Sequence, residues 1–83
     1  MSELKNIIKY VDRKRKDLNI VNAGIEREMI ILRKENPDTY GDSKMYSDLM
    51  IEYQKNDYEI SMMISLQVLL RTIGSIKDKL NEY

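Results

Sequence analysis

Residues 60–76, ISMMISLQVLLRTIGSI, constrain the fold most, because they are apolar on two sides of a helix and carry one charge, Arg71. A first stripe at helical spacing consists of Ile60, Met63, Gln67 and Leu70. A second stripe, which continues to the C terminus, consists of Met62, Leu66, Leu69, Ile73, Ile76, Leu80 and Tyr83. Each exposed stripe would forfeit roughly 25 cal/mol per Å² of apolar surface left in water. One partner helix covers only one of them.

The same segment is shorter than a typical membrane span. Ser61, Ser65, Gln67 and Arg71 interrupt it, whereas a bilayer requires ~20 mostly apolar residues. We therefore expect no membrane partner and interpret the two stripes as surfaces that other helices cover.

The composition excludes several classes of function. The 83 residues include no cysteine and no histidine, which excludes disulfides, thiolate or imidazole metal sites, and Ser-His or Cys-His catalysis. We expect no cofactor and no metal. The start of the chain lacks the apolar core of a secretory signal, so we expect a cytoplasmic protein. Enrichment in Ile, Lys, Asn, Tyr and Met suggests an AT-rich genome and hence a bacterial cell or a phage-infected host cell.

The chain divides into two long helices within one helical-hairpin domain of residues 1–83. We predict helices over about 3–35 and about 43–81, joined by a loop over about 36–42. Pro37 disfavours the α conformation in the residue before it, and the segment NPDTYGD collects turn-forming residues. Asp42 or Ser43 is expected to cap the second helix.

Apolar residues alternate at spacings of four and three in both helices, which predicts a coiled-coil-like seam. The seam of the first helix consists of Leu4, Ile8, Val11, Arg15, Leu18, Asn22, Ile25, Met29 and Leu32. The seam of the second consists of Tyr46, Leu49, Tyr53, Asn56, Ile60, Met63, Gln67, Leu70 and Gly74. If the chain folds back at the loop, a seam residue of the first helix faces the seam residue of the second helix for which the two residue numbers sum to about 78. This pairing places Asn22 opposite Asn56, where the two amides can satisfy each other. The predicted fold class is all-α, a long antiparallel two-helix hairpin.

The second stripe has no intrachain partner in this hairpin. Two hairpins that associate through it would form a homodimeric four-helix bundle, and the exposed stripe is also compatible with higher oligomers. The predicted oligomer interface is therefore Met62, Leu66, Leu69, Ile73, Ile76, Leu80 and Tyr83. The alternative is that the stripe docks a different protein.

The chain is neutral overall, but its charge is distributed unevenly. Residues 1–19 contain six basic and three acidic side chains, and residues 60–83 contain three and two. Residues 20–59 contain five basic and nine acidic side chains, so the loop half is net −4. A cationic end attracts phosphates, and a tyrosine adds a stacking face. The predicted partner or ligand contacts are Lys9, Tyr10, Arg13, Lys14, Arg15, Lys16 and Arg71, together with Tyr40 in the loop.

The simpler interpretation of the basic run is a solvated face with intrahelical ion pairs such as Asp12 with Lys16. For Arg15 and Arg71, the choice is between a buried cation that needs an anion and a stem that reaches out to water. Among the carboxylates, only Asp48 and Glu52 form a pair on one helix face, which is too little for a metal-assisted enzyme.

We therefore predict a non-enzymatic protein-interaction module, a small phage or bacterial regulator or inhibitor. It is expected to bind a second copy of itself and another macromolecule, which we expect to be a protein. One alternative is a phosphate-ligand binder, either a nucleic-acid-binding dimer or a nucleotide-sequestering protein, which uses the basic end at residues 9–16. Another alternative is a structural assembly module.

Overall fold

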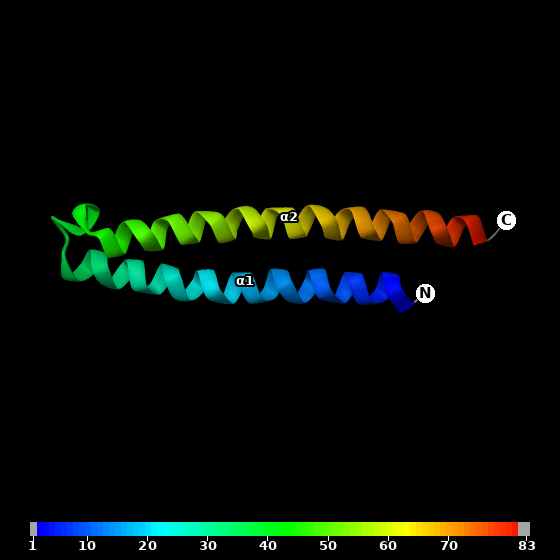
Figure 1. The fold of residues 1–83 in the computed structure, drawn as a ribbon, viewed down its shortest axis with the longest axis horizontal. Coiled ribbons are helices and arrows are strands. Elements are labelled where there is room, and N and C mark those ends of the chain that lie inside the picture. Colours follow the sequence, from blue (N-terminus) through cyan, green and yellow to red (C-terminus); the bar gives the residue numbers. More distant parts are fainter. Residues whose placement is uncertain (1, 82–83) are drawn as a thin grey trace.

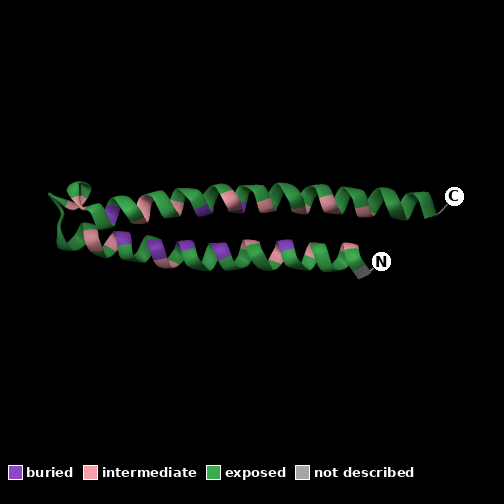
Figure 2. Cartoon of the chain, in the orientation of Figure 1, coloured by how far each residue is buried: buried purple, intermediate pink, exposed green. Residues whose placement is uncertain are grey.

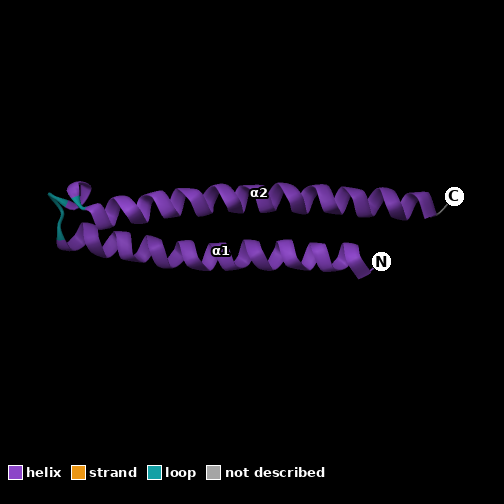
Figure 3. Cartoon of the chain, viewed as in Figure 1, coloured by secondary structure: helices purple, strands orange, loops and turns teal. Residues whose placement is uncertain are grey.

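The computed structural model describes residues 2–81 and confirms the all-α hairpin (Figure 1). Helix α1 spans Ser2–Glu35 and helix α2 spans Lys44–Asn81, with a short 3-10 turn, η1, at Tyr40–Asp42 between them (Figure 3). The two long helices lie antiparallel and side by side, within a rod of 66 × 15 × 15 Å. Tyr83, predicted as the last member of the second stripe, lies outside the described residues.

The loop is built by backbone hydrogen bonds that stop one helix and start the next. The Asn36 carbonyl accepts from the Tyr40 amide at 2.9 Å, which turns the chain directly after α1. Helix α2 then begins under a side-chain cap, because the Tyr46 amide donates to Ser43 Oγ at 3.3 Å. Of the two residues predicted as candidate caps, Ser43 is therefore the one that makes the bond.

The buried residues lie on the predicted seam (Figure 2). The buried side chains are Val11, Leu18, Asn22, Ile25, Met29, Tyr46, Asn56 and Ile60. The predicted pairing also holds at the open end, where a Cβ built on Gly74 would lie 4.0 Å from Leu4 Cδ2. A two-helix hairpin has a core one side chain thick, so only the residues between the helices lose contact with water.

The predicted Asn22–Asn56 layer is present at the middle of the seam. Asn56 Nδ2 donates to Asn22 Oδ1 at 3.0 Å, and Asn22 Nδ2 donates to the Tyr53 carbonyl at 3.2 Å. Both side chains are buried, so these bonds replace the water that the amides lose. The layer holds the two helices at one axial offset.

The best-packed part of the core lies next to the loop. Ile25, Met29 and Tyr46 form a buried cluster there. The ring of Tyr40 packs edge-on against Tyr46, with centroids 5.0 Å apart and planes at 64°. Tyr40 was predicted as an exposed contact residue. It is instead half-buried, because this aromatic contact draws it onto the core.

The other half of the hairpin is covered much less. No residue from 61 to 81 is buried, and the seam positions Met63, Gln67, Leu70 and Gly74 are only half-buried (Figure 2). Helix α2 also extends past the start of α1 (Figure 1). The half of α2 that is richest in apolar residues is therefore the half that the hairpin covers least.

Candidate interaction surfaces

The second stripe is a continuous exposed surface on α2. Its six described side chains are 38% to 68% exposed, Leu66 being the most covered and Leu80 the least. Successive residues of an α-helix are rotated by about 100° about the helix axis. The centre of the stripe is therefore about 110° away from the centre of the seam around the axis of α2. In a four-helix bundle, each helix packs on two neighbours at roughly right angles around its axis. The stripe therefore lies where a second neighbour packs.

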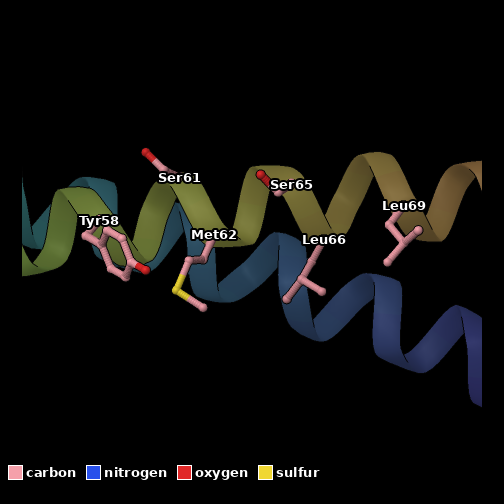
Figure 4. Close-up of a pocket in the computed structure, with 6 residues that line it drawn as sticks. All are labelled: Tyr58, Ser61, Met62, Ser65, Leu66 and Leu69. Carbon is pink, nitrogen blue, oxygen red and sulfur yellow. The ribbon is translucent and has the colours of Figure 1, made fainter.

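The N-terminal part of the stripe contains an apolar groove of ≈ 430 Å³ (Figure 4). The residues that line it are Tyr58, Ser61, Met62, Ser65, Leu66 and Leu69. Figure 4 shows Met62, Leu66 and Leu69 projecting from one edge of α2 and the short side chains of Ser61 and Ser65 at the other edge. Two serines one turn apart leave room for the side chains of a packed helix. The spacing of these two small residues is the sequence signal for the groove, and the predicted interface did not include them.

Helix α1 presents a weaker apolar face on the same side of the hairpin. In an antiparallel coiled coil whose seam residues occupy heptad positions a and d, the residues directly before the a positions flank the same side of the seam in both helices. The a positions here include Ile8 and Asn22 of α1 and Gln67 and Gly74 of α2. Ile7 and Val21 of α1 therefore share a side with Leu66 and Ile73 of α2. Ile7 and Val21 are 50% and 47% exposed. The α1 face is interrupted by exposed Lys14, Asp17 and Glu28.

Helix α2 also meets the minimum length and composition for a membrane span. An 18-residue window within Lys44–Asn81 has a mean hydropathy of 1.2, and 6% of that window is buried. The same exposed apolar residues produce both this window and the second stripe. The expectation of no membrane partner stays a prediction.

The opposite, polar side of the hairpin is organised by Asp12. Its Oδ1 accepts from Arg15 Nη2 at 3.2 Å and from Gln67 Nε2 at 3.1 Å, and its Oδ2 lies 3.1 Å from Lys16 Nζ. Hydrogen bonds from Lys16 and then Arg15 lower the pKa of the Asp12 carboxyl below its ordinary value of 3.8. The predicted ion pair of Asp12 with Lys16 is confirmed. The bond to Gln67 was missed, although the two residue numbers sum to 79.

Arg15 lies on the seam with its stem covered and its head paired. Its side chain is 27% exposed and its Nη2 bonds to Asp12, while Nε is buried without a hydrogen-bond partner among the described atoms. Arg71 is exposed, on the side of α2 opposite the second stripe. Arg71 therefore matches the expectation of a side chain that reaches out to water, whereas Arg15 lies between the two alternatives, because it is partly covered and paired with the Asp12 carboxylate.

The basic run divides between different faces of α1. Lys9, Arg13 and Lys16 share one outer face, around a shallow hollow that Asp12 and Asp17 also line. Tyr10 and Lys14 are exposed on the face that turns toward the second stripe. The structure thus gathers three of the predicted cationic contacts, flanked by two carboxylates.

The acidic half shows no clustered ligand set. Asp48 lies 3.7 Å from Lys44 in an exposed ion pair. Among residues 2–81, no three His, Cys, Asp or Glu side chains come together in a way that would hold a metal ion.

The comparisons with known proteins identify no relative. The chain matches no known family, and no curated protein or solved structure is significantly similar to it.

Proposed function

We propose that this protein is a non-enzymatic interaction protein that forms a homodimeric four-helix bundle through the second stripe. In this proposal it is a small regulator or inhibitor of phage or bacterial origin. It acts in the cytoplasm by occupying a surface of another macromolecule. The observation that carries the proposal is the continuous apolar stripe on α2, whose six described side chains are 38% to 68% exposed.

The total surface of the chain supports self-association. The hairpin exposes 6732 Å², whereas a compact monomer of 9.9 kDa exposes about 5,200 Å². The excess is roughly 1,500 Å² per chain, and obligate homodimers bury about 2,000–5,000 Å² in total. Packing two hairpins through their apolar faces would therefore bring the exposed surface into the range of folded proteins.

A phosphate-ligand binder is the second candidate. It is favoured by the common outer face of Lys9, Arg13 and Lys16, a position that a dimer formed through the second stripe leaves open. Asp12 and Asp17 offset part of that charge. Binding to a phosphate backbone weakens steeply with salt, whereas an apolar protein interface does not.

Size exclusion with light scattering, recorded at 260 and 280 nm, tests these proposals together. We expect a dimer without a nucleotide signal. A strong 260 nm signal favours the phosphate-ligand binder, and an assembly larger than four chains favours a structural module. A monomer contradicts self-association.

A matched pair of variants tests the stripe itself. Leu69→Asp places a charge in the stripe and should give a monomer, because an unpaired buried carboxylate is costly. Val68→Asp is the control, since Val68 is 60% exposed and lies about 120° away from the stripe. If the Leu69→Asp variant remains dimeric, the interface is elsewhere.

A further inference from the structure

The two helices offer unequal apolar faces to a second hairpin. The stripe on α2 is unbroken from Met62 to Leu80, whereas the matching face of α1 carries Lys14, Asp17 and Glu28. No residue of α1 lies opposite Leu80, because paired residue numbers sum to about 78. The end of α2 accordingly projects past the start of α1 (Figure 1). By the residue sum of 78, a packing that sets α2 on the partner's α1 would therefore leave Leu80 uncovered and place Met62 and Leu66 near the partner's Asp17 and the partner's Lys14.

Symmetry allows two ways to pack two such hairpins face to face. If both loops point to the same end, the two-fold axis runs along the rod and each α2 packs on the α1 of the partner. If the loops point to opposite ends, the axis is perpendicular to the rod. Each α2 then packs on the partner's α2, and each α1 on the partner's α1. Only the second arrangement places the unbroken stripe against itself.

The spacing of the stripe defines where the axis passes. From 62 to 80 the stripe is symmetric about position 71, so an antiparallel copy pairs Met62 with the partner's Leu80 and Leu66 with the partner's Ile76. Leu69 then pairs with the partner's Ile73. All six described members of the stripe are covered in this register.

Helix α1 independently supports the same axis. The sum of 78 places Ile7 at the level of position 71, and Ile7 is a half-exposed apolar residue on the face that turns toward the partner. On the two-fold axis, Ile7 meets the partner's Ile7. The overlap of the two α1 helices ends near residue 13, so Lys14, Asp17 and Glu28 all lie outside the contact.

The charge distribution opposes the alternative arrangement. Residues 20–59 are net −4, with Asp48, Glu52 and Glu59 on α2. Loops at the same end would hold two such acidic halves side by side, and like charges repel. Loops at opposite ends separate them.

We propose that, within the dimer proposed above, the two hairpins overlap only through their terminal halves. Their loops point to opposite ends, and Ile7 packs on the partner's Ile7. The dimer is then a rod of about 100 Å, given the 66 Å length of one hairpin and a rise of 1.5 Å per residue. It carries one acidic loop end at each extremity and is therefore bivalent for any basic partner that these ends bind.

Disulfide trapping tests the contact between the two Ile7 side chains, and the absence of native cysteine makes single-cysteine variants unambiguous. We expect Ile7→Cys to form an interchain disulfide on mild oxidation, because a disulfide requires Cβ atoms about 3.5–4.5 Å apart. Val21→Cys is the matched control, on the same face of α1 and similarly exposed, and should remain reduced. Small-angle scattering should give a maximum dimension of about 100 Å for the unmodified dimer.

The outcomes separate this inference from the proposed function. A monomer in light scattering refutes the dimer itself. A dimer with a maximum dimension near the 66 Å of one hairpin refutes the opposed loops but leaves self-association standing. A long dimer in which Ile7→Cys stays reduced, or crosslinks no better than Val21→Cys, overturns the register.

Discussion

At the scale of single residues, Asn22 and Asn56 determine the alignment of the helices. Their amides bond to each other at 3.0 Å in a mostly apolar seam. A shift of one helix along the other would leave both amides buried against alkyl side chains, at a cost of about 1–3 kcal/mol each. An alkyl layer at the same place has no such preference. The pair therefore selects one register among several that the apolar spacing allows.

We predict opposite effects for single and double substitutions of this pair. Asn22→Leu alone should lower the free energy of unfolding by about 1–3 kcal/mol, because it strands Asn56 without a partner. Replacing both by leucine should restore most of that loss but loosen the register or the specificity of assembly. Urea unfolding combined with light scattering measures both effects. Additive losses in the double variant, or unchanged assembly, would contradict the role of the layer.

The ionisation of Asp12 links the stability of the hairpin to pH. Its pKa is lowered in the folded chain by Lys16 and Arg15, so its charge contributes stability above pH 3.8. That contribution is lost as the pH falls through the lower, folded-state value. We predict that Asp12→Asn is less stable than the unmodified protein near pH 7 and that the difference shrinks as the pH falls below 3.8.

Two measurements check the prediction for Asp12. Titration followed by NMR should give the Asp12 carboxyl a pKa below 3.8. Urea unfolding of Asp12→Asn at several pH values should show the shrinking difference, with Asp17→Asn on the same helix as the charge-matched control. A difference that stays constant with pH would show that the ion pairs do not couple to folding.

At the scale of elements, the loop determines where each helix ends. Pro37 follows Asn36, the first residue after α1, and the Asn36 carbonyl accepts from the Thr39 and Tyr40 amides to close the turn. Ser43 then satisfies the Tyr46 amide at the start of α2. The Ile25, Met29 and Tyr46 cluster packs beside this loop, so the cap and the best-packed core stabilise the same end of the hairpin.

We predict that Ser43→Ala costs about 1 kcal/mol of stability, because it leaves an amide at the start of α2 without its acceptor. Asp42→Ala is the control, since Asp42 was the other candidate cap and its side chain does not make this bond. Thermal unfolding by circular dichroism compares the two. Equal losses would mean that Ser43 stabilises the loop rather than the helix start.

At the scale of the whole molecule, the hairpin is divided into a well-packed half and an uncovered half. Among the residues that the structure describes, the eight buried side chains lie at positions 11–60, while residues 61–81 contain none. An isolated hairpin of this kind has a core one side chain thick and depends on association for further burial. Folding and dimerisation are therefore expected to be coupled.

This coupling predicts a melting temperature that depends on concentration. A dimer that unfolds to separate chains gains stability by mass action, and we expect a rise of roughly 3–6 °C for each tenfold increase in protein concentration. Scanning calorimetry over two decades of concentration measures it. Leu69→Asp should show no such dependence, and a constant melting temperature for the unmodified chain would indicate a folded monomer.

The sequence by itself determined the local and periodic features of this protein. Helix type, the position of the loop, both seams and the pairing of Asn22 with Asn56 follow from spacing, because side chains three and four residues apart must share a helix face. The exposure of the second stripe also follows, since one partner helix covers only the seam.

Only the tertiary structure decided how polar side chains at the seam's edge are used. The spacing of residues along the sequence determines which helix face a side chain occupies but not which rotamer it adopts or which atom it contacts. It therefore left open whether Asp42 or Ser43 caps α2. It also missed that Gln67 reaches Asp12 and that Tyr40 turns onto Tyr46. The bond between Gln67 and Asp12 exists because the antiparallel packing brings the two helices together. The contact between Tyr40 and Tyr46 depends on how the loop folds onto the start of α2.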